Sequence, residues 1–188
     1  SIHSRTRYRL DSIPSNKYQK LAFYVGVHSS LNHTDPAQFP ADHPLNPNLN
    51  NLHWNWEGGY IFMALEGHWR VKEQSAVEGY AYHYATDAMY TRVGLPIQHD
   101  LNEDSQITIG LDLDHILDGL SFEKDGSTTH SAQGDPVSMR IKQNLSSAFR
   151  VLEVNEKLGA PSGAKLMPID LPAKPTAYPI SFPKHIPI

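Results

Sequence analysis

Residues that are able to bind a metal are crowded into one short region of the chain. Residues 31–62 hold three of the eleven histidines and two of the three tryptophans, namely His33, His43, His53, Trp54 and Trp56. Imidazole is the commonest metal ligand in proteins, and indole is a redox-sensitive ring. The chain has no cysteine, so any metal must be held by His, carboxylate, carbonyl, Met or a modified side chain.

Two histidines stand out by their surroundings. His33 lies in the turn-forming sequence Asn32-His33-Thr34-Asp35-Pro36. We expect a neighbouring Asn or Asp side chain to hold its ring in one tautomer, as partners of metal ligands do. His83 lies in the middle of an aromatic segment, so its ring is expected to point into packed or semi-buried space. Two neutral imidazoles on a rigid scaffold suit Cu(I), Cu(II), Zn or Ni.

The other candidates have simpler explanations. His53 is the closest rival, because it stands directly beside Trp54. If residues 53–56 are extended, His53 and Trp54 face opposite sides, whereas Trp54 and Trp56 share a side; this tryptophan pair is equally suited to anchoring a core. His130 follows a polar loop beside a predicted helix start and keeps a smaller expectation of function. The remaining histidines are expected to lie on the surface or to make ordinary hydrogen bonds.

Several strands must position these residues. Apolar, aromatic and β-branched runs predict strands over residues 21–28, 59–68, 76–85 and 106–113. In the third of these, the period of two places Tyr80, Tyr82 and Tyr84 on one face and His83 on the other.

Loops and short helices are expected to connect the strands. Residues 29–52 contain many Pro and Asn residues and predict a long ordered loop, and such loops are usually functional. Asp114 is expected to cap a helical turn, and residues 135–154 predict a helix that starts after an Asp-Pro pair. We expect residues 1–19 to form an N-terminal arm and residues 159–188 to form a Pro-rich extended tail that wraps the body.

Together these elements predict an all-β-leaning fold. We expect residues 1–188 to form a single sandwich-like antiparallel β domain with long irregular loops and one or two short helices. The 188-residue length is enough for one sizeable core. The chain starts at Ser1, as expected of a processed exported protein and equally of a shortened chain.

Composition and missing motifs exclude several functions. The net charge is −4, which does not favour nucleic-acid binding. No apolar run approaches the roughly 18 residues that a transmembrane helix requires. The sequence also lacks a Gly-x-Ser-x-Gly turn, a His-Glu-x-x-His helix and a Gly-x-Gly-x-x-Gly loop.

A set of ordered motifs over about residues 23–86 resembles the MbnP-like copper-binding family, and within it the surface copper-binding proteins of methanotrophs. The motifs are Gly26-Val27-x-x-x-Leu31-Asn32-His33-x-Asp35-Pro36, then Pro44-Leu45-Asn46, then Leu52-His53-Trp54-x-Trp56-x-x-Gly59-Tyr60-x-Phe62. Members of this family are exported and are paired with a di-haem oxidase of the MbnH type.

The resemblance implies a mononuclear copper site, with Cu(I) favoured. Its ligands would be His33, His83 and a kynurenine, which is an oxidised tryptophan. Trp54 is the first choice for the modified residue, and Trp56 and Trp69 remain open. Many family members carry four cysteines, and this chain has none. This departure places any disulfide-dependent part of the fold in question and leaves the His and Trp positions intact.

The sequence therefore predicts a secreted, periplasmic or cell-surface protein that binds copper for acquisition or storage and is not an enzyme. One alternative is a copper oxidase or monooxygenase with an open coordination position. A substrate cleft lined by His115 and His130 would favour this alternative. The other alternative is a surface structural domain without a metal.

Overall fold

The computed structural model describes residues 7–10, 12–55, 57–73, 75–101 and 105–156. The predicted tail over residues 159–188 lies outside these residues, as do residues 1–6 and 11 of the predicted N-terminal arm and Trp56. The elements, in chain order, are β1 Asn16–Val25, α1 Ser29–Asn32, η1 Pro36–Gln38, α2 Pro47–Asn50, β2 His53–Asn55, β3 Gly59–Trp69, β4 Glu78–Ala85, η2 Asp87–Met89, β5 Thr91–Leu101, β6 Ser105–Leu111, α3 Leu113–Ile116, α4 Phe122–Asp125, β7 Thr128–Thr129, α5 Pro136–Leu145 and β8 Phe149–Glu156.

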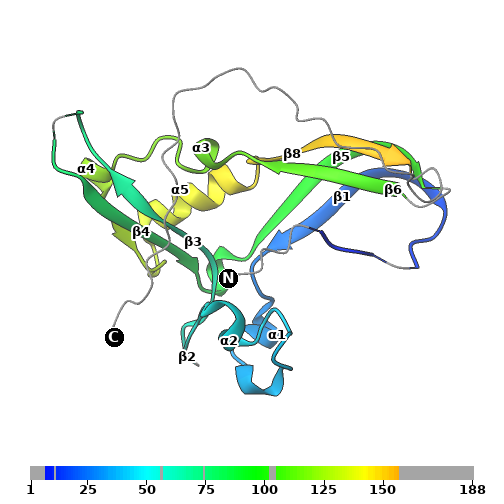
Figure 1. Cartoon of the computed structure of the whole chain (residues 1–188), viewed down its shortest axis with the longest axis horizontal. Helices are drawn as coiled ribbons and strands as arrows, with labels where there is room; N and C mark the ends of the chain where they lie inside the picture. Colours follow the sequence, from blue (N-terminus) through cyan, green and yellow to red (C-terminus); the bar gives the residue numbers. More distant parts are fainter. Residues whose placement is uncertain (1–6, 11, 56, 74, 102–104, 157–188) are drawn as a thin grey trace, which may run out of the picture.

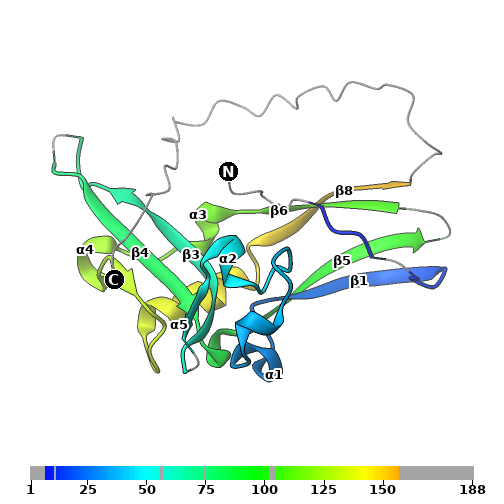
Figure 2. The same cartoon turned by 60° about the horizontal axis from the view of Figure 1, so that its bottom comes forward.

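The strands of the described chain form three sheets. Strands β1 and β5 make one antiparallel pair, β6 and β8 make another, and a four-stranded sheet has the order β2-β3-β4-β7. The first two pairs run side by side away from β3 and β4 (Figures 1 and 2). Phe23 of β1 packs edge-on against Phe149 of β8, with ring centroids 5.0 Å apart. The fold is thus β-rich with short helices, as predicted.

The main core lies between helix α5 and one face of the β3–β4 pair. Tyr82 and Tyr84 of β4 are fully buried together with Ile141 and Leu145 of α5. Burial of each such apolar side chain contributes about 1.5–3 kcal/mol. The buried tyrosines are those that the period of two placed on one face, so the opposite face of β4 is left for His83.

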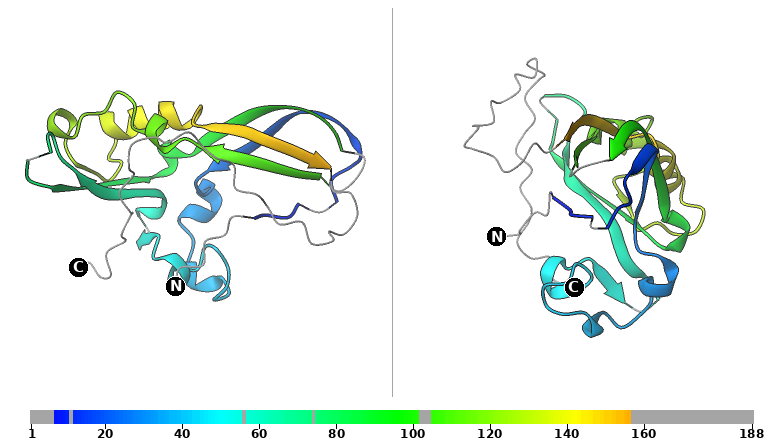
Figure 3. Two further views of the ribbon diagram at one scale, coloured as in Figure 1. Left: turned by 45° about the horizontal axis from the view of Figure 1, so that its top comes forward. Right: turned by 90° about the vertical axis from the view of Figure 1, so that its right-hand side faces the viewer.

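The segment between β1 and β3 lies below this sheet and carries α1 and α2 (Figures 1 and 3). It corresponds to the long loop predicted over residues 29–52, but it contains three short helical segments. Each begins after a residue whose side chain accepts a backbone N–H, respectively His28, Asp35 and Asn46. Such caps give a Pro- and Asn-rich segment a defined path without a long helix.

Several boundaries differ from the sequence predictions. The strand predicted over residues 21–28 is β1, which starts earlier and ends at Val25, because His28 caps α1. The last predicted strand ends at Leu111. The cap of the following turn is Asp112, not Asp114, since the Asp112 carboxylate accepts the N–H of His115 at 3.1 Å.

The largest correction concerns residues 135–154. The helix starts as predicted but ends at Leu145, and residues 149–156 form β8, which pairs with β6. Leu152 has a helix-compatible spacing, yet it is 56% exposed on β8, so tertiary pairing overrides the local pattern. The sequence pattern also does not predict β5, because Gly94 and Pro96 interrupt it. No helix within the described ranges has the length and apolar character needed to span a membrane.

Candidate metal centre

The four-stranded sheet brings Trp54 and His83 together. His83 of β4 stands opposite Ala64 of β3, and Trp54 lies in β2, on the other side of β3. The ring centroids of Trp54 and His83 are 5.9 Å apart. Two of the three predicted site residues therefore lie on the same face of one sheet.

A carboxylate fixes the orientation of the His83 ring. Glu66 lies two residues along β3 from Ala64, on the same face. The Glu66 Oε1 atom is 2.6 Å from Nε2 of His83. Because an ionised carboxylate only accepts hydrogen bonds, Nε2 must carry the proton. The lone pair of the neutral ring is then on Nδ1.

The Nδ1 atom of His83 is buried and has no hydrogen-bond partner among the described residues. A buried nitrogen lone pair without a partner is costly in a stable protein. Such an atom can donate its lone pair to a metal ion. A carboxylate on the opposite ring nitrogen is the usual partner of a metal-binding His. His83 therefore fits a metal such as copper.

A third ring, that of His130, joins this cluster. Its centroid is 5.3 Å from that of His83 and 5.6 Å from that of Trp54. Strand β7 pairs in parallel with β4, with Ala81 opposite Thr128 and Tyr82 opposite Thr129. His83 and His130 each follow directly after the last pair of this register. Nothing in the sequence marks a two-residue parallel strand, so the neighbourhood of His130 and His83 is not evident before folding.

Hydrogen bonds fix the loop that carries His130. The Ser131 hydroxyl donates to the carbonyl of His83 at 2.9 Å and accepts the N–H of Ala85 at 3.0 Å. Ser131 also has a φ of 55°, a left-handed conformation that is uncommon outside Gly, Asn and Asp. These bonds tie the side chain of Ser131, the residue after His130, to the backbone of β4.

A buried polar network supports the same loop from the start of α5. Asp135 accepts hydrogen bonds from the hydroxyls of Thr129 and Ser138 and caps the helix through two backbone N–H groups. Burial alone would raise the pKa of Asp135, but the hydrogen bonds from Ser138, Thr129 and Val137 outweigh it, so the pKa is lowered. The carboxylate is therefore charged and holds the loop at neutral pH.

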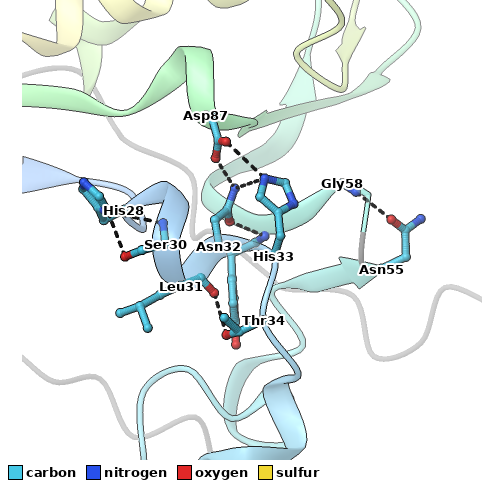
Figure 4. Close-up of polar contacts among 10 residues, drawn as sticks. His28, Ser30, Leu31, Asn32, His33, Thr34, Asn55, Gly58 and Asp87 are labelled. Carbon is cyan, nitrogen blue, oxygen red and sulfur yellow. Dashed lines mark hydrogen bonds and ion pairs between the residues drawn. The ribbon is translucent and has the colours of Figure 1, made fainter.

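His33 lies in a polar cluster with Asn32 and Asp87, directly after α1 (Figure 4). Its Nε2 atom is 3.1 Å from Oδ2 of Asp87, whose Oδ1 accepts a bond from Asn32 at 2.7 Å. The predicted Asn or Asp partner therefore exists, but the carboxylate comes from Asp87, 54 residues later. The neighbouring Asp35 instead caps η1. As at His83, a carboxylate engages Nε2.

The adjacent glycines Gly58 and Gly59 contact Trp54 and Asn32 respectively. The side chain of Asn32 is fully buried, and its Oδ1 accepts the N–H of Tyr60 at 2.8 Å. A Cβ atom on Gly59 would lie 2.6 Å from this Oδ1, and one on Gly58 would lie 3.2 Å from Cε3 of Trp54. The Asn32–His33 segment and Trp54 thus pack against adjacent residues of one turn.

The rival candidates occupy other environments. His53 packs edge-on against Tyr60 with ring centroids 4.7 Å apart, whereas the ring of Trp54 lies beside those of His83 and His130. Burial lowers the pKa of His53 and the charge of Asp35 partly opposes this, and its Nε2 atom is buried without a partner among the described residues. Trp69 stacks on Phe122 at 5.4 Å, which suits a core residue.

His115 does not share the cluster of His130. Its ring nitrogens contact Asp118 at 2.7 Å and Ser147 at 3.0 Å. Within the described ranges, no three His, Cys, Asp or Glu side chains are grouped so that they could hold a metal ion. The ring of Trp54 lies beside the imidazoles of both His83 and His130.

Comparison with known proteins agrees with the sequence resemblance. A family model described as MbnP matches residues 3–133. This span covers more than half of the chain and includes every residue of the cluster. No curated protein and no solved structure matches the chain.

Proposed function

We infer that the chain binds copper, because it belongs to the MbnP family, a family associated with copper. We propose that the protein is an extracytoplasmic or cell-surface copper-binding protein that serves copper acquisition or storage. We further propose that it holds one Cu(I) ion and that it is not itself an enzyme.

The observation that carries this proposal is the buried, unpaired Nδ1 atom of His83 beside Trp54. The hydrogen bond from Nε2 to Glu66 leaves Nδ1 as a ready donor atom. Cuprous ion prefers soft ligands, so a site without thiolate binds it tightly only when its imidazoles are held in place beforehand. The Glu66 carboxylate and the rigid β3–β4 pair provide that restraint.

The proposed ligand set is His33, His83 and a kynurenine formed from Trp54. His33 has the same kind of support as His83, because the Asp87 carboxylate engages its Nε2 atom. Opening of the indole ring gives an aromatic amine and a carbonyl, which are a nitrogen donor and an oxygen donor. The reaction consumes an external oxidant such as O2 or peroxide and releases the lost ring carbon as formate, and a di-haem partner of the MbnH type is the proposed catalyst.

A competition titration tests the proposal. The full chain, purified from its native source without a metal chelator, is titrated with Cu(I) in the presence of a chromophoric Cu(I) chelator. We expect one copper per chain, and His83→Ala should abolish tight binding. His68→Ala is the matched control, since His68 is an exposed histidine on the neighbouring strand β3. Copper content well below one per chain, or full binding by His83→Ala, would contradict the proposal.

Peptide mass spectrometry of the same native protein tests the ligand derived from tryptophan. In the overall formula, formation of kynurenine replaces one carbon atom by one oxygen atom. The mass of the peptide that contains residue 54 should therefore rise by the mass of oxygen minus the mass of carbon. If Trp54, Trp56 and Trp69 all keep the mass of unmodified tryptophan, the kynurenine part of the proposal is wrong, while the copper titration still tests the imidazoles.

A further inference from the structure

His130 has no role in the ligand set proposed above, yet it is held against that set. Its ring lies at 5.3 Å from the ring of His83 and at 5.6 Å from that of Trp54. Among the described residues, the His130 side chain makes no hydrogen bond that would explain its position. The hydrogen bonds of Ser131 to β4 restrain the loop beside His130. Such a restraint is not expected for a surface histidine without a function.

We propose that His130 supplies a further imidazole to the copper ion bound at His83. This inference rests on the proposed function, and it extends the ligand set beyond His33, His83 and the modified tryptophan. The spacing suits a shared ion: with metal–nitrogen bonds of about 2.0–2.1 Å, two imidazoles on one metal have ring centres about 5–6 Å apart. The rings of His83 and His130 stand at 88° to each other, so they do not stack and their edges can face a common point.

The backbone around His130 is organised as a preformed site requires. The register of β7 with β4 places His130 beside His83. The Ser131 hydroxyl donates to the His83 carbonyl and accepts the N–H of Ala85, the two residues of β4 that flank Tyr84. The residues on both sides of His130, Thr129 and Ser131, are therefore attached to the strand that carries His83.

Exposure gives His130 a different part from His83. His83 is largely buried, whereas His130 is exposed. A copper donor or a chelator that approaches from solvent therefore meets the His130 imidazole first. In this arrangement His83 is the anchoring ligand and His130 is the outer ligand, through which the ion enters and leaves.

Copper K-edge X-ray absorption of the full chain loaded with Cu(I) tests the inference, because outer-shell scattering counts the imidazoles bound to the metal. The variant is His130→Ala and the control is His68→Ala, each also titrated against the Cu(I) chelator. We expect His130→Ala to lose one imidazole and to bind copper about tenfold or more weakly, which corresponds to about 1.4 kcal/mol. His68→Ala should match the unaltered protein.

Two results would overturn the inference in distinguishable ways. If His83→Ala loses copper but His130→Ala keeps the imidazole count and affinity of the control, the proposed function stands and the role of His130 is wrong. If the unaltered chain binds no copper, the proposed function fails and this inference fails with it. Because His130 is exposed, circular dichroism of His130→Ala should be unchanged, and a second variant, His130→Gln, repeats the test with a side chain of similar size.

Discussion

The region around His83 and the region around His33 hold their histidines by the same device in different surroundings. In each, a carboxylate engages Nε2 of the ring. The side chains of His83 and Glu66 are 15% and 26% exposed, whereas those of His33 and Asp87 are 39% and 45% exposed. Exposed ion pairs and charged hydrogen bonds are screened by water and salt and contribute little, while buried ones are screened much less.

The two regions also differ in the backbone that carries them. His83 and Glu66 lie on adjacent paired strands, so their separation is fixed by the β3–β4 register. His33 follows a single helical turn, and its partner Asp87 belongs to the short helix η2. The position of His83 is thus fixed by many backbone hydrogen bonds of the sheet. The position of His33 instead depends on a few side chains, chiefly the buried Asn32.

The largest expected difference between the regions concerns their carboxylates. Glu66→Ala should weaken Cu(I) binding by about 10–100-fold, the usual effect of removing the partner of a metal-binding His. Asp87→Ala should weaken it by less, because that pair is more exposed. Competition titration measures both, and Glu66→Gln, which keeps an acceptor oxygen, should recover part of the affinity. A larger loss in Asp87→Ala than in Glu66→Ala would reverse the comparison.

A glycine substitution tests the dependence of the loop region on Asn32. Gly59 has a φ of +67°, and an added Cβ would lie 2.6 Å from the Asn32 Oδ1 atom. Gly59→Ala should therefore lower the free energy of unfolding by about 1–3 kcal/mol, the usual cost of a strained backbone position. Gly79→Ala on β4 is the control, because its Cβ would meet nothing closer than 3.9 Å. Urea unfolding measures both variants; equal stability would show that the Asn32 contact is not restrictive.

The smallest expected effect concerns Asp135, which supports the His130 loop. Its pKa in the folded protein lies below the ordinary value of 3.8, so its charged form stabilises the fold above that pH. This contribution is lost as the pH falls from about 3.8 through the lowered pKa. Asp135→Asn should cost about 1–2 kcal/mol near pH 7.

The pH dependence separates Asp135 from an ordinary helix cap. The difference in unfolding free energy between the unaltered chain and Asp135→Asn should shrink when urea unfolding is repeated below pH 3.8. Asp112→Asn at the start of α3 provides a comparison with a cap outside the network. A stability difference for Asp135→Asn that stays constant from pH 7 to pH 3 would show that the charge of Asp135 does not hold the loop.

The sequence predicts one half of the cluster and misses the other for a physical reason. The alternation in β4 correctly predicts that Tyr82 and Tyr84 are buried in the core, and the Asp-Pro pair correctly predicts the start of α5. These patterns are local, so the sequence shows them directly. Copper binding by His33, His83 and Trp54 stays a prediction.

The missed features all depend on contacts between distant parts of the chain. His130 reaches His83 through a two-residue parallel strand, and Asp87 reaches His33 across 54 residues. The same limit explains β8, where pairing with β6 converts a helix-compatible segment into a strand. Short or long-range pairings leave little local pattern, so only the folded structure shows them.

The most direct test of the copper site is an anomalous difference map, recorded at the copper absorption edge from crystals of the native protein. We predict one copper peak at bonding distance from Nδ1 of His83, beside an opened ring at residue 54. A copper peak elsewhere, with no metal at the His83 Nδ1 atom, would contradict the proposed copper site.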